Sequence, residues 1–219
     1  MKLFSTYSVK IKHYSHIFKE TVALYRAAVD FLIQVCLDEW DTLSEMNSVL
    51  RNNYVEQLCH RTKDTPDVVY PAFDRKFYKF PSYLRRSAIS EAIGKVSSYK
   101  SNLTNWESED PNTRGRRPSA PKAGYVYPSM YRTVMYEQSG DYEMKIKVFI
   151  RNTWDWLTVK VRKSDMDYIN RRCASRKKCA PTLQKRGKEW FLDFPFEETV
   201  KLPDTDVFDQ TILAVDLGI

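Results

Sequence analysis

The chain begins with one strand pattern, which is followed by about one hundred residues of mostly helical pattern before strand patterns return. Over residues 3–12, Tyr7, Val9 and Ile11 alternate with polar residues, which is typical of a strand. A single strand cannot satisfy its backbone hydrogen bonds beside helices alone, so it needs a partner strand from later in the chain. We therefore expect residues 3–12 to pair with strands beyond residue 124, which makes the helical residues an insertion into a β-barrel.

Apolar residues recur at spacings of three and four over residues 16–40 and 44–62, which predicts two amphipathic helices. In the second helix we expect Leu50 on the apolar side. Residues 64–81 contain three prolines and are predicted to be a connector. Ser82 begins a third helix, in which Gly94 is a weak helix former. Its predicted apolar stripe consists of Leu84, Ala88, Ala92, Val96, Tyr99, Leu103 and Trp106.

Strand patterns return after a linker rich in proline and arginine. Residues 145–150 and 157–162 alternate apolar and polar side chains, and residues 182–196 have the pattern of a hairpin. In the second arm of this hairpin, Trp190, Leu192, Phe194 and Phe196 are predicted to share one face. A short helix is expected from Ser164, as its cap, to Arg172.

The positive charge is concentrated in one part of the chain. Residues 114–188 contain 19 Lys or Arg against 6 Asp or Glu, a net charge of +13, whereas residues 1–113 carry +1 and residues 189–219 carry −7. A charged run is often only a solvated surface, but a concentrated excess with interleaved aromatic residues favours nucleic-acid binding. The candidate contacts are Arg114, Arg116, Arg117, Lys122, Tyr125, Tyr127, Tyr131, Arg132, Arg176, Lys177, Lys178, Lys185 and Arg186.

Other classes of protein are disfavoured by what the sequence lacks. No apolar run has the length of a membrane-spanning helix and no secretory signal is recognisable, so we expect a cytoplasmic protein without disulfides. Cys173 and Cys179 are spaced too widely for a usual zinc site. There is no glycine-rich phosphate loop and no His-Glu-x-x-His motif, and the three histidines are interpreted as interface or capping residues.

The last residues, 212–219, form an apolar strand pattern that carries Asp216 and then Gly218. A carboxylate on such a strand needs a partner to stay ionised, and a divalent metal ion is one candidate. The alternative is an ordinary aspartate at the end of a strand.

An ordered set of motifs resembles the TnpB-type (OrfB-type) transposon-encoded proteins, which are related to the type V CRISPR effector nucleases. The motifs are residues 80–99, Arg114-Gly-Arg-Arg-Pro118, Pro121-Lys-Ala-Gly124, Met130-Tyr-Arg132, Lys188-Glu-Trp-Phe-Leu192 and Ala214-Val-Asp-Leu-Gly-Ile219.

The resemblance implies an α+β fold in which a wedge-type β-barrel is interrupted by a helical recognition bundle. The wedge would comprise residues 1–14 and 123–203, and the helical recognition insertion residues 15–113. Residues 114–122 would be a basic linker. Residues 204–219 would be an acidic linker and the first strand of a RuvC-like domain of the ribonuclease H type.

The resemblance also implies a function, namely binding of a guide RNA from the transposon end and of a target DNA. Asp216 matches the first catalytic carboxylate, which would bind Mg²⁺ in a full-length relative. The further Glu, Asp and zinc-ribbon cysteines of that family do not follow within the 219 residues. We therefore expect this chain alone not to cut DNA and Mg²⁺ not to bind it tightly. The chain could be a fragment or half of a split gene. Alternatives are a nuclease-dead nucleic-acid-binding regulator, a protein-interaction domain or a remnant of a truncated gene.

Overall fold

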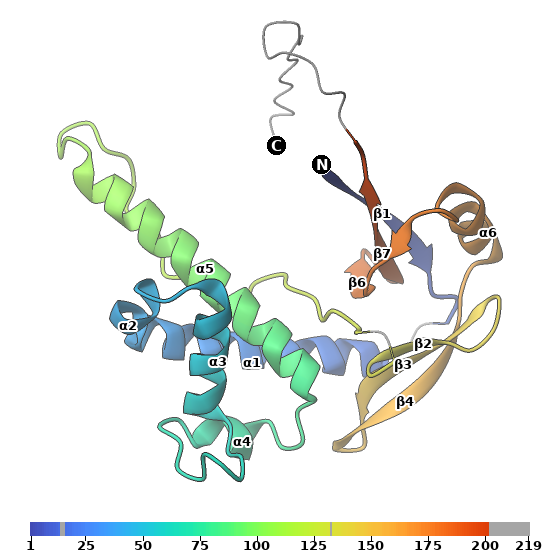
Figure 1. Ribbon diagram of the computed structural model, residues 1–219, viewed down its shortest axis with the longest axis horizontal. Helices are drawn as coiled ribbons and strands as arrows, with labels where there is room; N and C mark the ends of the chain where they lie inside the picture. Colours follow the sequence, from blue (N-terminus) through green and yellow to red (C-terminus); the bar gives the residue numbers. More distant parts are fainter. Residues whose placement is uncertain (14–15, 132, 202–219) are drawn as a thin grey trace, which may run out of the picture.

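The computed structural model describes residues 1–13, 16–131 and 133–201. The helices of residues 16–108 fill one part of the molecule, and the strands together with the helix of residues 163–172 fill the other (Figure 1). The first helix extends from the helical part to the sheets (Figure 1). The expected mixture of helix and sheet, an α+β fold, is therefore confirmed. Residues 204–219, and with them Asp216, lie outside the described residues, as does Arg132.

The opening strand belongs to a sheet made of strands from the far end of the described chain. β1 (Lys2–Lys10) pairs antiparallel with β7 (Glu189–Thr199) along its whole length. On its other side β7 pairs with β6 (Thr182–Arg186) and with β5 (Lys177–Lys178). The prediction that the first strand pairs beyond residue 124 is confirmed.

A second sheet contains β2 (Tyr136–Gln138), β3 (Glu143–Ile150) and β4 (Thr153–Lys160) in that order. An isolated bridge between Ile11 and Val161, just beyond the ends of β1 and β4, connects it to the first sheet. A second bridge joins Ser129, in the segment before β2, to Thr182 of β6. No closed barrel is seen among the described residues. β4 ends at Lys160 and the helix α6 (Lys163–Arg172) begins three residues later, so the ladder between the two sheets stops after a few residues.

The hairpin between β6 and β7 has the predicted place and the predicted buried face. Its two-residue loop begins with Gly187 at a φ of 57°, a left-handed conformation that glycine adopts without steric cost. Trp190, Leu192, Phe194 and Phe196 are all buried. They form the side of the first sheet that faces the core.

The predicted helices are present with shifted ends. α1 (His16–Asp38) and α5 (Ser82–Ser108) match the first and third patterns. Between them lie the short helices α2 (Trp40–Ser44) and α4 (Ala72–Lys76) and the longer α3 (Ser48–Cys59).

Two details of the helix predictions are wrong. α3 begins only at Ser48, because the Asn47 side chain accepts hydrogen bonds from the first free N–H groups of that helix, and Leu50 is 53% exposed. The cap of α6 is Arg162, not Ser164, which lies inside the first turn. Asp165 instead accepts a hydrogen bond from the Lys10 N–H at 3.0 Å and so joins α6 to β1.

An aromatic cluster joins the helical part to the sheets. Phe73 and Phe77 from the proline-rich connector pack against Phe80, and Phe80 meets the ring of Trp154 in β4 at a centroid distance of 5.4 Å. The three phenylalanines are buried. The connector is thus part of the core. Among the described residues no helix is long and apolar enough to cross a membrane.

Candidate nucleic-acid interface

The second half of α5 leaves the core and extends away from the rest of the molecule (Figure 1). Its buried residues end at Val96, and from there to Ser108 every side chain is at least partly exposed. The chain turns at the tip of α5 and then returns beside it as residues 118–122, which approach the helix again. The basic linker therefore lies on an exposed helix rather than between two domains.

Two arginines of this linker lie over the ring of Trp106, near the end of α5. The Arg114 guanidinium lies 3.9 Å from the centre of the Trp106 ring, and that of Arg117 lies 6.0 Å from it. The Trp106 Nε1–H donates a hydrogen bond of 2.7 Å to the Gly115 carbonyl, which fixes the loop to the helix. We call Trp106 and residues 114–117 the tip cluster.

The arginines of the tip cluster are available to a partner. Among the described residues, Arg114, Arg116 and Arg117 form no ion pair. The acid nearest in the loop, Asp110, is used locally, because its side chain accepts hydrogen bonds from Asn112. A loop ordered in this way can present guanidinium groups to phosphates at a small cost in conformational entropy.

The far end of the linker is fixed to α1. The Ala123 N–H donates to the Asp30 carboxylate at 2.7 Å, and the Arg26 Nε–H donates to the Val126 carbonyl at 2.9 Å. Arg26 also lies over the rings of Tyr127 at 4.7 Å and of Tyr125 at 5.7 Å, and Tyr125 remains 87% exposed. Tyr125 can therefore offer a ring face to a base.

The remaining residues of this region that were predicted to contact nucleic acid differ in whether their side chains are exposed or are used inside the fold. The Tyr127 hydroxyl donates to the Lys185 carbonyl, so this tyrosine helps to hold the fold together. Tyr131 packs against Tyr83 at a centroid distance of 5.3 Å. Lys122 is exposed and Lys185 is half-buried.

The other predicted cations lie on the first sheet, beside the acidic residues of β7. Arg176 contacts Glu198 at 2.9 Å and Lys177 contacts Glu197 at 3.1 Å. Hydrogen bonds from Lys2 and Lys177 hold the pKa of the Glu197 carboxyl below its usual value. The acidic end of the sequence thus neutralises part of the basic segment.

Two further cations of this group are also engaged. Arg186 pairs with Asp193 at 2.5 Å and donates to the Ser8 hydroxyl at 2.6 Å. The Lys178 ammonium lies 4.3 Å from the centre of the Phe194 ring and 3.3 Å from the Tyr136 hydroxyl. The structure therefore separates the predicted contacts into a free group at the tip of α5 and a largely paired group on the sheet.

A groove of about 730 Å³ lies between α5 and the returning linker. Its floor includes Ser90, Gly94, Ser98 and Asn102 of α5, and its opposite wall includes Pro118 and Pro121. No function was predicted for these residues from the sequence. The sequence shows their four-residue spacing of small and polar side chains. It does not show that the linker returns beside them to form the opposite wall of a groove.

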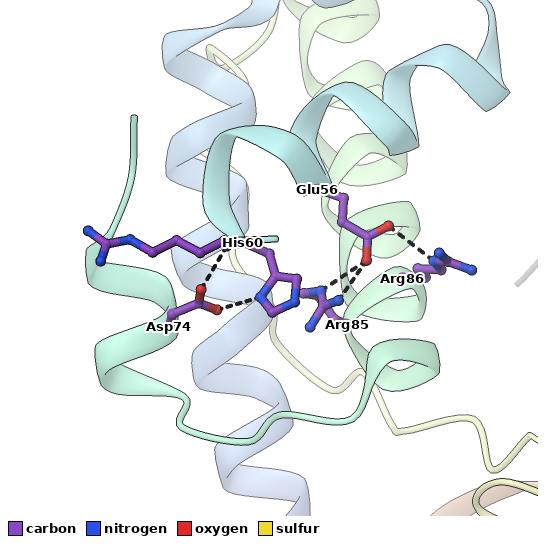
Figure 2. Close-up of polar contacts among 6 residues, drawn as sticks. Glu56, His60, Asp74, Arg85 and Arg86 are labelled. Carbon is purple, nitrogen blue, oxygen red and sulfur yellow. Dashed lines mark hydrogen bonds and ion pairs between the residues drawn. The ribbon is translucent and has the colours of Figure 1, made fainter. Parts of the chain in front are cut away.

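A polar cluster joins α3, α4 and α5 (Figure 2). Glu56 accepts two hydrogen bonds from Arg85, at 2.8 and 3.0 Å, and one from Arg86 at 3.0 Å. His60, at the end of α3, contacts Asp74 through Nδ1 at 2.8 Å, in agreement with its interpretation as a capping or interface residue. These contacts fix the relative positions of the three helices.

The cysteines are free thiols. Burial raises the pKa of Cys36 and of Cys59 to about 12, so both are protonated and unreactive at neutral pH. Among the described residues no group of three or more His, Cys, Asp or Glu side chains could hold a metal ion. Asp216, the predicted Mg²⁺ ligand, is not among those residues.

Comparison with known proteins places the chain in a family. The model of the Aq_aa04 family matches residues 5–150, which include most of β1, all helices of the helical part, the tip cluster and β3. The chain belongs to the Aq_aa04 family. A relative described as uncharacterized protein aq_aa04, from Aquifex aeolicus (strain VF5), is 37% identical over 83 residues. That match covers 38% of this chain and 45% of the relative, so it spans less than half of the relative's length.

Proposed function

We propose that this chain is the nucleic-acid-binding part of an RNA-guided DNA endonuclease of the TnpB type, which binds a guide RNA and its target DNA. The observation that carries the proposal is the tip cluster. Arg114, Arg116 and Arg117 have no carboxylate partner among the described residues, and their loop is tied to Trp106 on the exposed end of α5. Fixed guanidinium groups at an exposed site are suited to phosphate oxygens. Tyr125, exposed beside the same linker, adds a surface on which an unpaired base can stack.

The topology supports the same proposal. The helices from α1 to α5 lie in sequence between β1 and the strands with which β1 shares its sheet. This is the order of a helical recognition domain inserted into a wedge domain. We propose that the two sheets, joined at Ile11–Val161, form an open version of that wedge.

Asp216 completes the proposal as the first metal-binding carboxylate of the nuclease. In such a site carboxylates from several strands would hold Mg²⁺, and the bound ion would supply activation of the attacking water and charge stabilisation at the leaving oxygen. Asp216 would supply one oxygen ligand, and the later strands of a RuvC-like domain would supply the others.

A cleavage assay with guide RNA, target DNA and Mg²⁺ tests the proposal. We expect no cleavage by the 219-residue chain and cleavage by a form extended with a complete RuvC-like domain, because only the extended form holds the full set of carboxylates. In that form Asp216→Ala should abolish cleavage, while the nearby control Asp209→Ala should retain it. Cleavage by the 219-residue chain that is lost in Asp216→Ala would contradict the claim that these residues bind nucleic acid but need the added RuvC-like domain to cut it. RNA and DNA binding without cleavage by the extended form would favour a nuclease-dead regulator.

A further inference from the structure

Gly94 has no structural explanation within the chain. It lies in the middle of α5, where glycine weakens a helix relative to alanine. Its backbone is helical and its φ is not positive, so the conformation does not require glycine. A Cβ atom added there would meet nothing within 4 Å, so packing does not exclude a side chain either.

The space beside Gly94 is the groove between α5 and the returning linker. Ser90, Gly94, Ser98 and Asn102 follow one another at four-residue spacing, so they form a row of small and polar side chains that winds along the helix. Trp106 comes one more step along this row. The groove therefore extends toward the tip cluster.

The linker spans the groove as a strap held at its two ends. Trp106 holds Gly115 at one end, and Asp30 holds the Ala123 N–H at the other. Among the described residues, no hydrogen bond joins residues 116–122 to α5. Pro118 and Pro121 on the strap lack N–H donors and restrict the backbone, so the strap keeps its distance from the helix instead of closing on it.

The charges around the groove indicate what could occupy it. Lys122 on the strap is exposed, and Lys95 on α5 faces Glu91 at only 3.8 Å, a weak exposed ion pair. Beyond Asn102 the groove leads toward the tip cluster, where Arg114 and Arg117 lie over Trp106. A groove with cations along its walls and an aromatic residue at its end is the usual arrangement for a single strand of nucleic acid.

We propose that this groove binds an unpaired stretch of RNA or DNA, with the sugar-phosphate backbone passing over Gly94 and toward Trp106. A volume of about 730 Å³ is that of a small-ligand site, which accommodates about two nucleotides of one strand and not a turn of duplex. Gly94 then serves the ligand, because the missing side chain allows the backbone of the strand to approach the helix. The inference rests on the proposed function. It adds that the bound nucleic acid is single-stranded here and that its backbone runs over Gly94 toward Trp106.

The test compares Gly94→Leu with Gly94→Ala, each with a short unstructured oligonucleotide and with a duplex of the same length. Gly94→Leu should weaken single-strand binding at least tenfold, change duplex binding less than twofold, and leave the thermal midpoint no lower than that of the wild type. Gly94→Ala should raise the midpoint and weaken single-strand binding less than threefold. Thr104→Leu, which places the same leucine side chain on an exposed part of α5 outside the groove, is the matched control and should bind like the wild type.

The outcomes separate this inference from the proposed function. If the wild type binds neither probe, the proposed function fails. If the wild type binds the single strand and Gly94→Leu binds it equally well, the groove inference is wrong while the proposed function stands. Equal loss of single-strand and duplex binding in Gly94→Leu would also overturn the assignment to an unpaired strand. Ser98→Leu, the next position on the groove floor, repeats the test if Gly94→Leu does not fold.

Discussion

Replacement of Glu56 by alanine should lower the free energy of unfolding by about 3–5 kcal/mol, the usual cost of removing one partner from a buried ion pair. Only 7% of the Arg85 side chain is exposed, and Glu56 accepts two of its hydrogen bonds (Figure 2). Without Glu56 the guanidinium would be left buried with no carboxylate beside it. Arg86, whose side chain is 59% exposed, can turn to water and should contribute little.

Thermal and denaturant unfolding measure this effect. For a chain of this size the loss corresponds to a fall in the thermal midpoint of about 10 °C. Glu91→Ala is the matched control, because Glu91 faces Lys95 at 3.8 Å on the exposed side of α5, and it should cost about 0.5 kcal/mol or less. If Glu56→Ala proves no more destabilising than Glu91→Ala, the cluster does not hold α3 and α5 together.

Replacement of Arg114, Arg116 and Arg117 by glutamine should weaken RNA binding about 100-fold at about 50 mM salt. Each arginine that contacts a phosphate displaces counterions, so three lost contacts should also make the dependence of log K on log salt less steep by about 2. The change leaves the fold intact, because these side chains are exposed or half-buried and form no ion pair among the described residues.

A second triple variant controls for net charge. Lys63, Arg75 and Lys76 are exposed cations on the connector and α4, and their replacement by glutamine removes the same charge from another surface. We expect this variant to lose less than threefold in affinity and to keep the salt dependence of the wild type. If both triple variants lose affinity equally, binding depends on total charge and the tip cluster has no special role.

Much of the fold followed from local pattern. The lone opening strand required a distant partner, and β7 supplies it. The alternation of Trp190, Leu192, Phe194 and Phe196 predicted the buried face of that strand correctly. These predictions succeeded because burial of one face of a strand follows directly from the period of two.

What failed depended on contacts that the local pattern does not encode. Leu50 has the right helical spacing, but α3 turns that residue to solvent. The barrel was predicted because the opening strand needs a partner among the later strands. Closure also requires a continuous ladder between β1 and β4, and that contact is limited to the Ile11–Val161 bridge before α6 begins. The pairing of Arg85 with Glu56 joins residues 29 apart in sequence, and no periodicity predicts it.

The sequence predicted which basic residues belong to the candidate interface, but not how they are arranged in space. The basic segment was recognised from its charge, but the acids of β7 neutralise the part that contains Arg176, Lys177 and Arg186. Trp106 was predicted to belong to an apolar stripe. It lies beneath Arg114 because the linker returns along α5, and the sequence pattern does not encode that path. The groove over Gly94 depends on the same return.

RNA co-purification tests the central claim most directly. The chain is expressed together with its native flanking DNA and purified at low and at high salt, and the bound RNA is sequenced. We predict enrichment of one structured RNA transcribed from the DNA next to the gene, which is released at high salt and is lost in the variant lacking Arg114, Arg116 and Arg117. Recovery of no RNA above that of an unrelated protein of similar charge, or of cellular RNA without any preference, would contradict the claim that this chain binds a guide RNA.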